Sequence, residues 1–430
     1  MDSSVVQKIL SVFLMLGITG ALVLSVMSKV GMDKIYTYSA GAAVFSLAIL
    51  VVAYFVAEDR FSIVSRYRNE YSKTGTAEEF IRSYSFSKRI KYLFIVGLVV
   101  LTAILVGFSL SAGIDGLSAW HAYSIVFDHM EGKTFEYGSD DWFHDILIWR
   151  SQLPRTIVAI IAGSALAIGG AIMQSVVKNP LADPYTTGIS SGAVLGATLV
   201  IVLGIRVSGL GQYSLVLSAF VFSLIPAGIM ISVSRISNNS PATIILVGTA
   251  VSYIFSAFST LIMMIADEQA MKDAFVWQVG SLSGTSWSYI PLMLGVTVVG
   301  SVLLYFTSGK LNLLMMGDDD AKSLGLNVEN YRMLCLILLS LMTASVVSYI
   351  GIIGFLGLIA PHIARIVLGS DIRLILPASA TLGAALMLLA DVISRIIAIG
   401  DMPVGVVLSF IGGPIFLLLV LRFRREAWQQ

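Results

Sequence analysis

The chain has 430 residues, of which 57% are hydrophobic and 12% charged, and its mean hydropathy is +0.89. A soluble domain is about 25% charged, so this composition excludes a soluble globular protein. The 27 Lys and Arg balance 26 Asp and Glu to a net charge of +1, which leaves no overall field to attract nucleic acid. The one cysteine, Cys335, lies in an apolar run and excludes disulfides within the chain and cysteine-based metal clusters.

Apolar segments long enough for membrane helices recur along the whole chain. A bilayer core of about 30 Å requires roughly 20 apolar residues per helix. Twelve candidates follow one another: Ile9–Met27, Tyr38–Ala57, Tyr92–Leu110, Ile157–Val177, Gly188–Leu203, Tyr213–Val233, Thr243–Ile265, Pro291–Phe306, Met333–Ile350, Phe355–Leu368, Leu374–Ile397 and Val404–Leu421. Three of them, Gly188–Leu203, Pro291–Phe306 and Phe355–Leu368, are short, so we expect them to be lengthened by their flanks or to be partly re-entrant. The first segment lacks an early basic cluster and a cleavage site, and is interpreted as a retained helix.

The distribution of Lys and Arg predicts the orientation, because positively charged loops stay in the cytoplasm. With the N-terminus inside, 19 of the 27 basic residues fall on the inner side. The opposite side receives an acidic loop at residues 113–149, whose acids are Asp115, Asp128, Glu131, Glu136, Asp140, Asp141 and Asp145. Both termini are therefore predicted to be cytoplasmic.

A basic segment, Glu58–Lys91, separates two N-terminal helices (residues 1–57) from a ten-helix remainder (residues 92–430). Within it, Thr76 and Glu79 have capping-box spacing and precede Phe80, Ile81 and Tyr84. Two interpretations are open: a short amphipathic helix on the inner membrane surface, or a solvated basic linker.

Small residues recur every fourth position in two segments. In lipid, close helix association depends on small residues that let backbones approach. The two stripes are Gly188, Gly192 and Gly196, and Gly405, Ser409 and Gly413. We expect helix packing at both, with ligand lining as the alternative.

Ionisable residues are scarce inside the predicted spans, where they normally mark function. Asp391 and Arg395 are the exception, and their spacing allows an i,i+4 ion pair toward the outer end of the eleventh span. Such a pair is either structural or functional. Arg150 and Arg155 flank Pro154 at the same predicted face; they either extend to the membrane interface or dock another protein.

The predicted cytoplasmic loop Gly317–Arg332 is expected to form two short helices. Asp318–Asp320 favour a helix N-terminus, Gly325 ends the first helix, and Asn327 caps the second. Ala321 and Leu324, three residues apart, are expected to face one way and to fit a groove on another protein; the alternative is an ordinary capped connector.

Other motifs argue against metal binding, nucleotide binding and catalysis by this chain. His121, His129 and His144 lie near acids, but their spacing matches no metal-ligand motif and favours a solvated loop. Gly132-Lys133-Thr134 imitates the end of a P-loop, yet Phe127 stands where its first glycine is required. We therefore predict no catalytic residue, no metal site and no bound nucleotide.

Four sequence strings carry a family resemblance: LPRT (153–156), NPLADPYTTGISSGA (179–193), GIIGFLGLIAPHIAR (351–365) and GGPIF (412–416). Together they resemble the permeases of bacterial and archaeal ABC importers for iron–siderophore complexes, haem and cobalamin. The resemblance runs from about Tyr92 to Arg425. It implies an all-α polytopic membrane protein with a ten-helix permease core, here preceded by two extra transmembrane helices.

The resemblance also implies the partners. Two permease subunits, identical or closely homologous, surround a central pathway in the cell (plasma or inner) membrane. Two cytoplasmic ATPases bind ATP and Mg²⁺, and an extracytoplasmic binding protein delivers the substrate and largely determines its identity.

Individual residues receive roles from the same resemblance. The ATPase-coupling loop corresponds to Asp318, Asp319, Asp320, Ala321, Lys322, Ser323, Leu324, Gly325 and Leu326. Arg155 and Arg395 match rim positions that meet acidic residues of the binding protein. The family often has a second arginine three residues before Arg155; this chain has Gln152 there and Arg150 nearby. Asn239 and Ser240 correspond to the region near the cytoplasmic gate.

The predicted function is therefore ATP-driven import through a permease subunit. The rival is an ion-coupled secondary transporter, because twelve spans with both termini inside also fit that class. Such transporters commonly use intramembrane acids and inverted repeats, whereas this sequence offers Asp391 as its one candidate acid and no convincing repeat.

Overall fold

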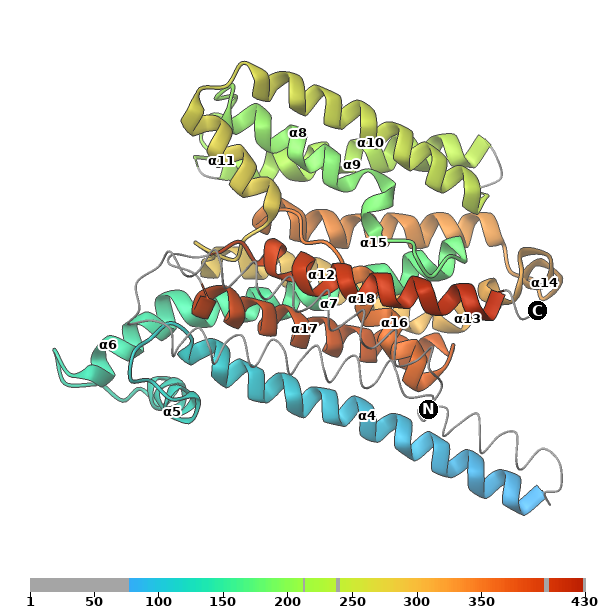
Figure 1. The fold of residues 1–430 in the computed structure, drawn as a ribbon, viewed down its shortest axis with the longest axis horizontal. Coiled ribbons are helices and arrows are strands. Elements are labelled where there is room, and N and C mark those ends of the chain that lie inside the picture. The colour runs from blue at the N-terminus through green and yellow to red at the C-terminus, as the bar shows by residue number, and fades with distance from the viewer. Residues whose placement is uncertain (1–76, 212, 237–239, 398–401, 428–430) are drawn as a thin grey trace, which may run out of the picture.

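The computed structural model describes residues 77–211, 213–236, 240–397 and 402–427, and the elements in these ranges are helices (Figure 1). The α-helices are α4 (Ala77–Ser111), α5 (Ala119–Met130), α6 (Asp140–Leu147), α7 (Leu153–Val177), α8 (Ile189–Ile201), α9 (Tyr213–Ile236), α10 (Pro241–Met264), α11 (Glu268–Val279), α12 (Ile290–Phe306), α13 (Ser308–Met316), α14 (Asp318–Ser323), α15 (Val328–Ile350), α16 (Leu356–Leu368), α17 (Ile372–Ile397) and α18 (Val404–Ala427). A π-helical turn, η3 (Ile148–Gln152), and two 3-10 turns, η4 (Pro184–Thr187) and η5 (Trp287–Tyr289), join them.

The ten predicted spans from Tyr92 onward each coincide with a helix. Seven helical stretches in the described residues are long and apolar enough to cross a membrane, and α8, α16 and the Val404–Leu417 part of α18 are shorter apolar helices. The short span predicted at Pro291 is lengthened by its flank, since η5 and α12 together run from Trp287 to Phe306. The chain is thus an all-α, multi-pass membrane protein. The first two predicted spans, Ile9–Met27 and Tyr38–Ala57, lie outside the described residues.

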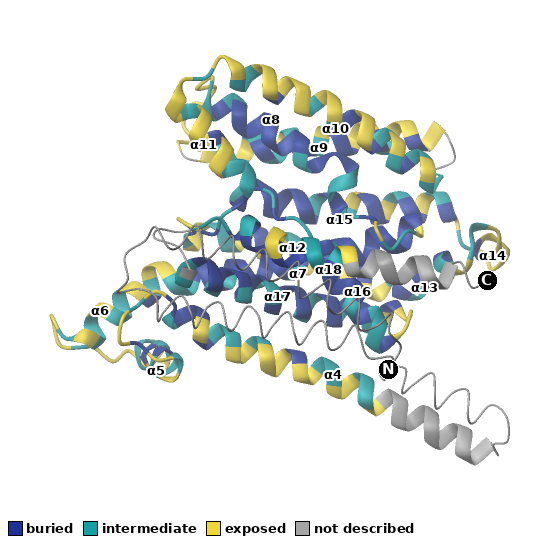
Figure 2. Ribbon diagram, in the orientation of Figure 1, coloured by how far each residue is buried: buried dark blue, intermediate teal, exposed yellow. Residues whose placement is uncertain are grey.

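The long helices run side by side, with α14 at one end of the bundle and α5, α6 and α11 at the other (Figure 1). Buried residues concentrate on α7, α15 and α17, while α4 and α10 expose one face (Figure 2). The helices α7 and α17 pack tightly at two glycines: a Cβ on Gly163 would lie 2.4 Å from the carbonyl oxygen of Gly383. Small residues therefore allow the central helix pair to form.

The helix α8 is short because the chain passes through η4 before α8 begins. A Cβ on Gly169, in the middle of α7, would lie 3.3 Å from the Pro184 ring. The turn η4 therefore lies deep in the bundle, beside the interior of α7. Such non-helical backbone is tolerated at membrane depth only where protein covers it. Asp183 and Tyr185 stabilise it: the Asp183 carboxylate accepts from the Tyr185 backbone N–H at 2.8 Å, and the Tyr185 hydroxyl donates to the Ile353 carbonyl at 3.2 Å.

The segment before the third predicted span is helical from Ala77 onward. The helix α4 runs without a break from Ala77 to Ser111, so this part of the basic segment Glu58–Lys91 is a direct extension of the span. Whether residues 77–91 lie on the membrane surface or in solvent stays a prediction.

The predicted outer loop, 113–149, is folded rather than extended. It contains α5 and α6, and α6, η3 and α7 form one continuous helical run from Asp140 to Val177. A small core supports it, made of Leu110, Leu117, Ala122, Ile125 and Ile148.

The two small-residue stripes behave differently. A Cβ on Gly192 or Gly196 would lie 2.3 or 2.5 Å from a backbone oxygen of α9, and one on Gly188, whose φ is +88°, would lie 2.8 Å from Pro226. The first stripe is therefore a helix contact, as predicted. The second stripe makes such a contact within this chain at Gly405, and helix packing at its other two residues stays a prediction.

In the second stripe one residue out of three is closely packed. A Cβ on Gly405 would lie 1.9 Å from the Val279 carbonyl oxygen, whereas Gly413 faces open space within this chain and Ser409 is exposed. The close contact lies on the next residue instead, since a Cβ on Gly412 would lie 2.5 Å from Phe355. Within this chain the helix therefore packs through the side that carries Gly405 and Gly412, which are seven residues apart.

Candidate functional site

The predicted coupling loop forms a compact helix with a defined end. The backbone N–H of Leu326 donates to the Ala321 carbonyl at 3.0 Å, and Gly325, with φ +85°, provides the left-handed residue that this closure needs. The Asn327 side chain then caps the next helix by accepting from the Asn330 N–H at 3.0 Å. The first helix, α14, is short as predicted; the second is the long α15.

The exposed face of α14 differs from the predicted one. Ala321 is fully buried in the main core, while Leu324 is 62% exposed. The expectation that these two share a docking face is wrong, because Leu324 is the C-cap where the chain leaves the helix. The residues available to another protein are Asp319, Asp320, Lys322, Ser323, Leu324 and Gly325.

Asp318 connects α14 to two long helices. Its Oδ1 accepts from Nζ of Lys178, the C-cap of α7, at 2.6 Å. Both carboxylate oxygens also accept from Nη2 of Arg332 on α15, at 2.8 and 3.0 Å. Partial burial raises the pKa of Asp318, but the hydrogen bonds from Lys178 and Arg332 outweigh burial and hold the pKa below its ordinary value. The first acid of the loop is therefore a structural tether.

A second ion pair closes the loop on its exposed side. Nζ of Lys322 lies 2.6 Å from Oε1 of Glu329, across the Gly325 turn. The hydrogen bond to Glu329 raises the pKa of Lys322 above its ordinary value.

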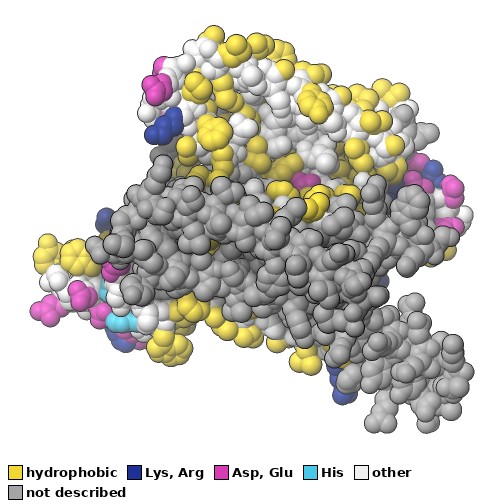
Figure 3. Space-filling model, viewed as in Figure 1, with side chains coloured by type: hydrophobic (Ala, Val, Ile, Leu, Met, Phe, Trp, Pro, Cys, Tyr) yellow, Lys and Arg dark blue, Asp and Glu magenta, His cyan; other side chains and the backbone are white. Residues whose placement is uncertain are grey.

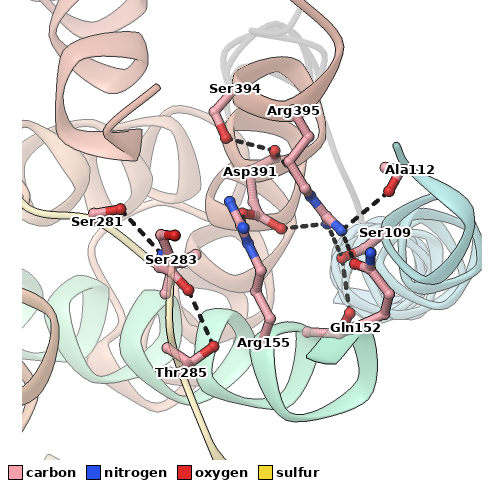
Figure 4. Close-up of polar contacts among 12 residues, drawn as sticks. Ser109, Ala112, Gln152, Arg155, Ser281, Ser283, Thr285, Asp391, Ser394 and Arg395 are labelled. Atoms are coloured by element: carbon pink, nitrogen blue, oxygen red, sulfur yellow. Dashed lines mark hydrogen bonds and ion pairs between the residues drawn. The ribbon is translucent and has the colours of Figure 1, made fainter. Parts of the chain in front are cut away.

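The other end of the bundle carries a buried cluster of charges (Figure 4). Nε of Arg155 on α7 donates to Oδ1 of Asp391 on α17 at 2.8 Å, and Nη2 of Arg395 donates to Oδ2 of the same carboxylate. Arg395 also donates to the Ser109 hydroxyl on α4 at 2.8 Å and to the Gln152 side-chain oxygen. The predicted i,i+4 pair is present, and Arg155 joins it.

This cluster bears on the predicted docking arginines. The side chains of Arg155 and Arg395 are both buried and directed at Asp391, which is itself fully buried. Arg150, on η3, is exposed. Gln152, which stands where the family often has an arginine, accepts a hydrogen bond from Arg395. Of the predicted rim residues, Arg150 therefore presents its charge at the surface, whereas the other two arginines join three helices.

Of the two candidate gate residues, Asn239 lies outside the described residues. Ser240 is the N-cap of α10, where its hydroxyl oxygen accepts from the Thr243 N–H at 3.2 Å. Its observed contacts are those of a helix cap.

The three histidines lie on α5 and α6 rather than in a solvated loop. His129 lies 2.6 Å from Asp145, and His121 lies 2.9 Å from Asp141. In the described part of the chain, no group of three or more acidic, histidine or cysteine side chains could hold a metal ion.

Sequence reasoning missed one buried polar seam between α7 and α16. The guanidinium of Arg365 donates to the side chain of Gln174, to Ser175 at 3.3 Å and to the Ala171 carbonyl at 3.3 Å. Gln174 in turn donates to the Gly357 carbonyl at 3.2 Å. The available signal was Gln174, an amide side chain inside an otherwise apolar span.

These features define a class: a polytopic, all-α membrane protein with a tethered loop helix at one end and a buried charge cluster at the other. The profile of the FecCD transport family matches residues 95–422. The chain therefore belongs to the FecCD transport family, whose members are permease subunits of ABC importers and are not themselves catalytic.

Individual relatives agree over most of their length. The hemin transport system permease protein HmuU of Yersinia pestis is 38% identical over 282 residues, covering 65% of this chain and 84% of that protein. The cobalamin import system permease protein BtuC of Halobacterium salinarum is 36% identical over 277 residues, covering 64% and 73%. A solved metal-chelate type ABC transporter in an inward-facing conformation matches with a TM-score of 0.66 and 29% identity, covering 76% of this chain and 98% of that chain.

Proposed function

We propose that this chain is the permease subunit that passes a metal chelate of the iron–siderophore, haem or cobalamin type into the cytoplasm, driven by separate ATPase subunits that bind ATP and Mg²⁺. The observation that carries the proposal is α14: it exposes Leu324 at the end of the bundle and is tied by Asp318 to α7 and α15. The names of the relatives supply the substrate class.

Coupling then follows from rigid connections. An ATPase groove receives the exposed face of α14, with Leu324 as its apolar contact. When nucleotide closes the ATPase pair, α14 moves, and the Asp318 ion pairs carry that displacement to α7 and α15. Because Arg332 is fully buried, the α15 end of this connection is fixed in the core.

The opposite end of the bundle receives the binding protein in this proposal. Arg150 is exposed and meets an acidic residue directly, which affects mainly the association rate and its salt dependence. Arg155 and Arg395 take part through their shared carboxylate, Asp391, which holds α4, α7 and α17 together beside the docking surface.

The remaining parts of the proposal concern assembly and orientation. The α14 end faces the cytoplasm, together with both termini, because basic residues gather in the loops at that end. A second permease subunit, identical or homologous, completes the pathway, and Asn239 and Ser240 lie at its cytoplasmic gate.

Reconstitution tests the proposal. The permease, its ATPase and its binding protein are placed in proteoliposomes with ATP and Mg²⁺ in the lumen, and uptake of ferric siderophore, haem or cobalamin is measured. We expect uptake that requires all three proteins and hydrolysable ATP. Uptake by the permease without the ATPase, driven by an ion gradient, would show a secondary transporter instead.

A further inference from the structure

The helix α5 lies across the bundle instead of along it. Figure 1 shows α5 nearly end-on, whereas α4, α7 and α15 lie in the plane of the picture. If the long helices cross the membrane, the axis of α5 runs parallel to the membrane plane. This is the orientation of a helix at a bilayer surface.

The contact with α4 fixes the depth of α5. The Tyr123 hydroxyl donates to the Ala103 carbonyl, and a Cβ on Gly107 would lie 2.6 Å from the Tyr123 ring and 3.3 Å from Ala119. Ala103 precedes the end of α4 at Ser111 by two turns, or about 12 Å at 1.5 Å per residue. The helix α5 therefore lies beside the last two turns of a membrane span, below its end.

One face of α5 exposes large apolar side chains. Trp120 is 84%, Phe127 62% and Met130 70% exposed. Trp120 and Phe127 are seven residues apart and so share one side of the helix. Ala122 and Ile125 point the other way, into the small core of this region.

The order of faces around α5 is that of an interfacial helix. The side with Ala119 and Tyr123 meets α4, and the neighbouring side carries Trp120 and Phe127, with Ser124 and the C-cap Glu131 at its edge. The polar side beyond it carries Asp128, which pairs with Lys133. The apolar face thus lies between the membrane span and the water-facing side. Trp is the side chain enriched at membrane interfaces.

The apolar face of α5 is continuous with the apolar surface of α4. Leu93, Val96, Val100, Ile104 and Phe108 of α4 are exposed large hydrophobic residues. Figure 3 shows apolar side chains extending from beneath α5 along α4, with acidic and histidine side chains on the side away from the bundle. A surface of this composition along a span faces lipid.

We propose that α5 is an interfacial anchor whose face of Trp120, Phe127 and Met130 inserts at the headgroup–acyl boundary of the leaflet at the α6 end of the bundle. The anchor holds α5, and through Tyr123 the end of α4, at a fixed depth. Its partner is the lipid itself, with no requirement for a particular headgroup.

Spin labels on the full chain test this assignment. Cys335 is the single, buried cysteine, so Cys335→Ala provides a background for Phe127→Cys on the apolar face and for Lys133→Cys, whose side chain is exposed beside Asp128 on the polar side. Ile104→Cys on α4 is the lipid-facing reference. Each labelled protein is reconstituted in vesicles of phosphatidylethanolamine and phosphatidylglycerol, and accessibility to oxygen and to a water-soluble nickel chelate is compared.

We expect the labels at 127 and 104 to be relaxed more by oxygen than by nickel, and the label at 133 to show the reverse. Equal nickel accessibility at 127 and 133 would overturn the proposal. Loss of accessibility to both reagents at 127 when the binding protein is added would also overturn it, since the face would then be a protein interface. Phe127 is mostly exposed, so its replacement leaves the core intact, and Trp120→Cys provides an independent second position.

Discussion

Arg155 and Asp391 lie 236 positions apart in the sequence and form a buried ion pair in which Nε and Oδ1 are 2.8 Å apart. The other oxygen of the same carboxylate accepts from Arg395. A buried charge is costly unless it is paired and hydrogen-bonded, so this carboxylate determines how α7 and α17 meet at this end of the bundle.

Removal of the shared carboxylate is the first prediction. Asp391→Asn leaves two buried guanidinium groups without this acceptor, and breaking a buried ion pair costs about 3–5 kcal/mol. We expect a clearly lower melting temperature of the purified protein in detergent, measured by intrinsic fluorescence. Asp115→Asn, at an exposed position of the same outer region, is the control and leaves the melting temperature unchanged. Equal melting temperatures for the two variants would contradict a stabilising role for the cluster.

Two substitutions of Gln152 should change the stability of the protein in opposite directions. Its side-chain oxygen accepts from Arg395, so Gln152→Glu places a carboxylate against a guanidinium, and Gln152→Arg places a second cation there. We expect the acidic variant to raise the free energy of unfolding, and the basic variant to lower it, by amounts on the order of 1 kcal/mol each. The melting temperatures should change in the same directions. Raised salt concentration should weaken a charge effect and leave a size effect unchanged. A change of the same sign in both variants would contradict an electrostatic contact between residue 152 and Arg395.

Asp318 predicts a pH dependence. Its pKa is below the ordinary value, so its ion pairs stabilise the folded state above the ordinary carboxyl pKa of about 4, and this contribution is lost as pH falls through the lowered pKa. The melting temperatures of wild type and Asp318→Asn should therefore differ most near neutral pH and converge in acid. Asp320→Asn is the matched control, since Asp320 is exposed on the same helix.

The Asp318 tether also predicts a defect in coupling. In reconstituted transporter, Asp318→Asn should reduce substrate uptake per ATP hydrolysed, while Asp320→Asn retains the wild-type ratio. Unchanged stoichiometry in Asp318→Asn would show that α14 transmits motion by another connection.

Leu324 tests the exposed face of α14. Leu324→Asp adds a charge to a predicted apolar contact, so we expect loss of uptake and of binding-protein-stimulated ATP hydrolysis. Stability should change by less than about 0.5 kcal/mol, because Leu324 is exposed and surface substitutions have small effects. Met316→Asp, at a residue of α13 that is 65% exposed, is the control for a new acid at this end of the bundle. Normal transport by Leu324→Asp would remove Leu324 from the ATPase interface.

The contact between α7 and α17 makes a steric prediction. Gly163→Ala places a Cβ 2.4 Å from a backbone oxygen of α17, so the helices must separate, at about 1–3 kcal/mol. Gly228→Ala on α9 has no neighbour within 4 Å of the new Cβ and should be neutral or stabilising through its helix propensity. The comparison of the two melting temperatures checks whether close backbone approach holds the central pair.

The sequence by itself determined the membrane class, ten of the helices and the short helix α14 with its Gly325 turn. Hydrophobic length is a local property, since each span satisfies its own backbone hydrogen bonds. The α14 turn is equally local, because Gly325 and Asn327 act on their immediate neighbours. The family strings identified the class of transporter for the same reason: they are contiguous.

Only the tertiary structure decided what the polar residues contact. It directed Arg155 and Arg395 into the protein, turned Ala321 inward and Leu324 outward, and folded the acidic outer region into α5 and α6. In the tertiary structure Gly412, and not Gly413, is the residue of α18 that lies close to Phe355. The physical reason is that the orientation of a helix about its axis is set by neighbours far away in the sequence. A carboxylate such as Asp391 acquires its role only when other helices bring arginines to it.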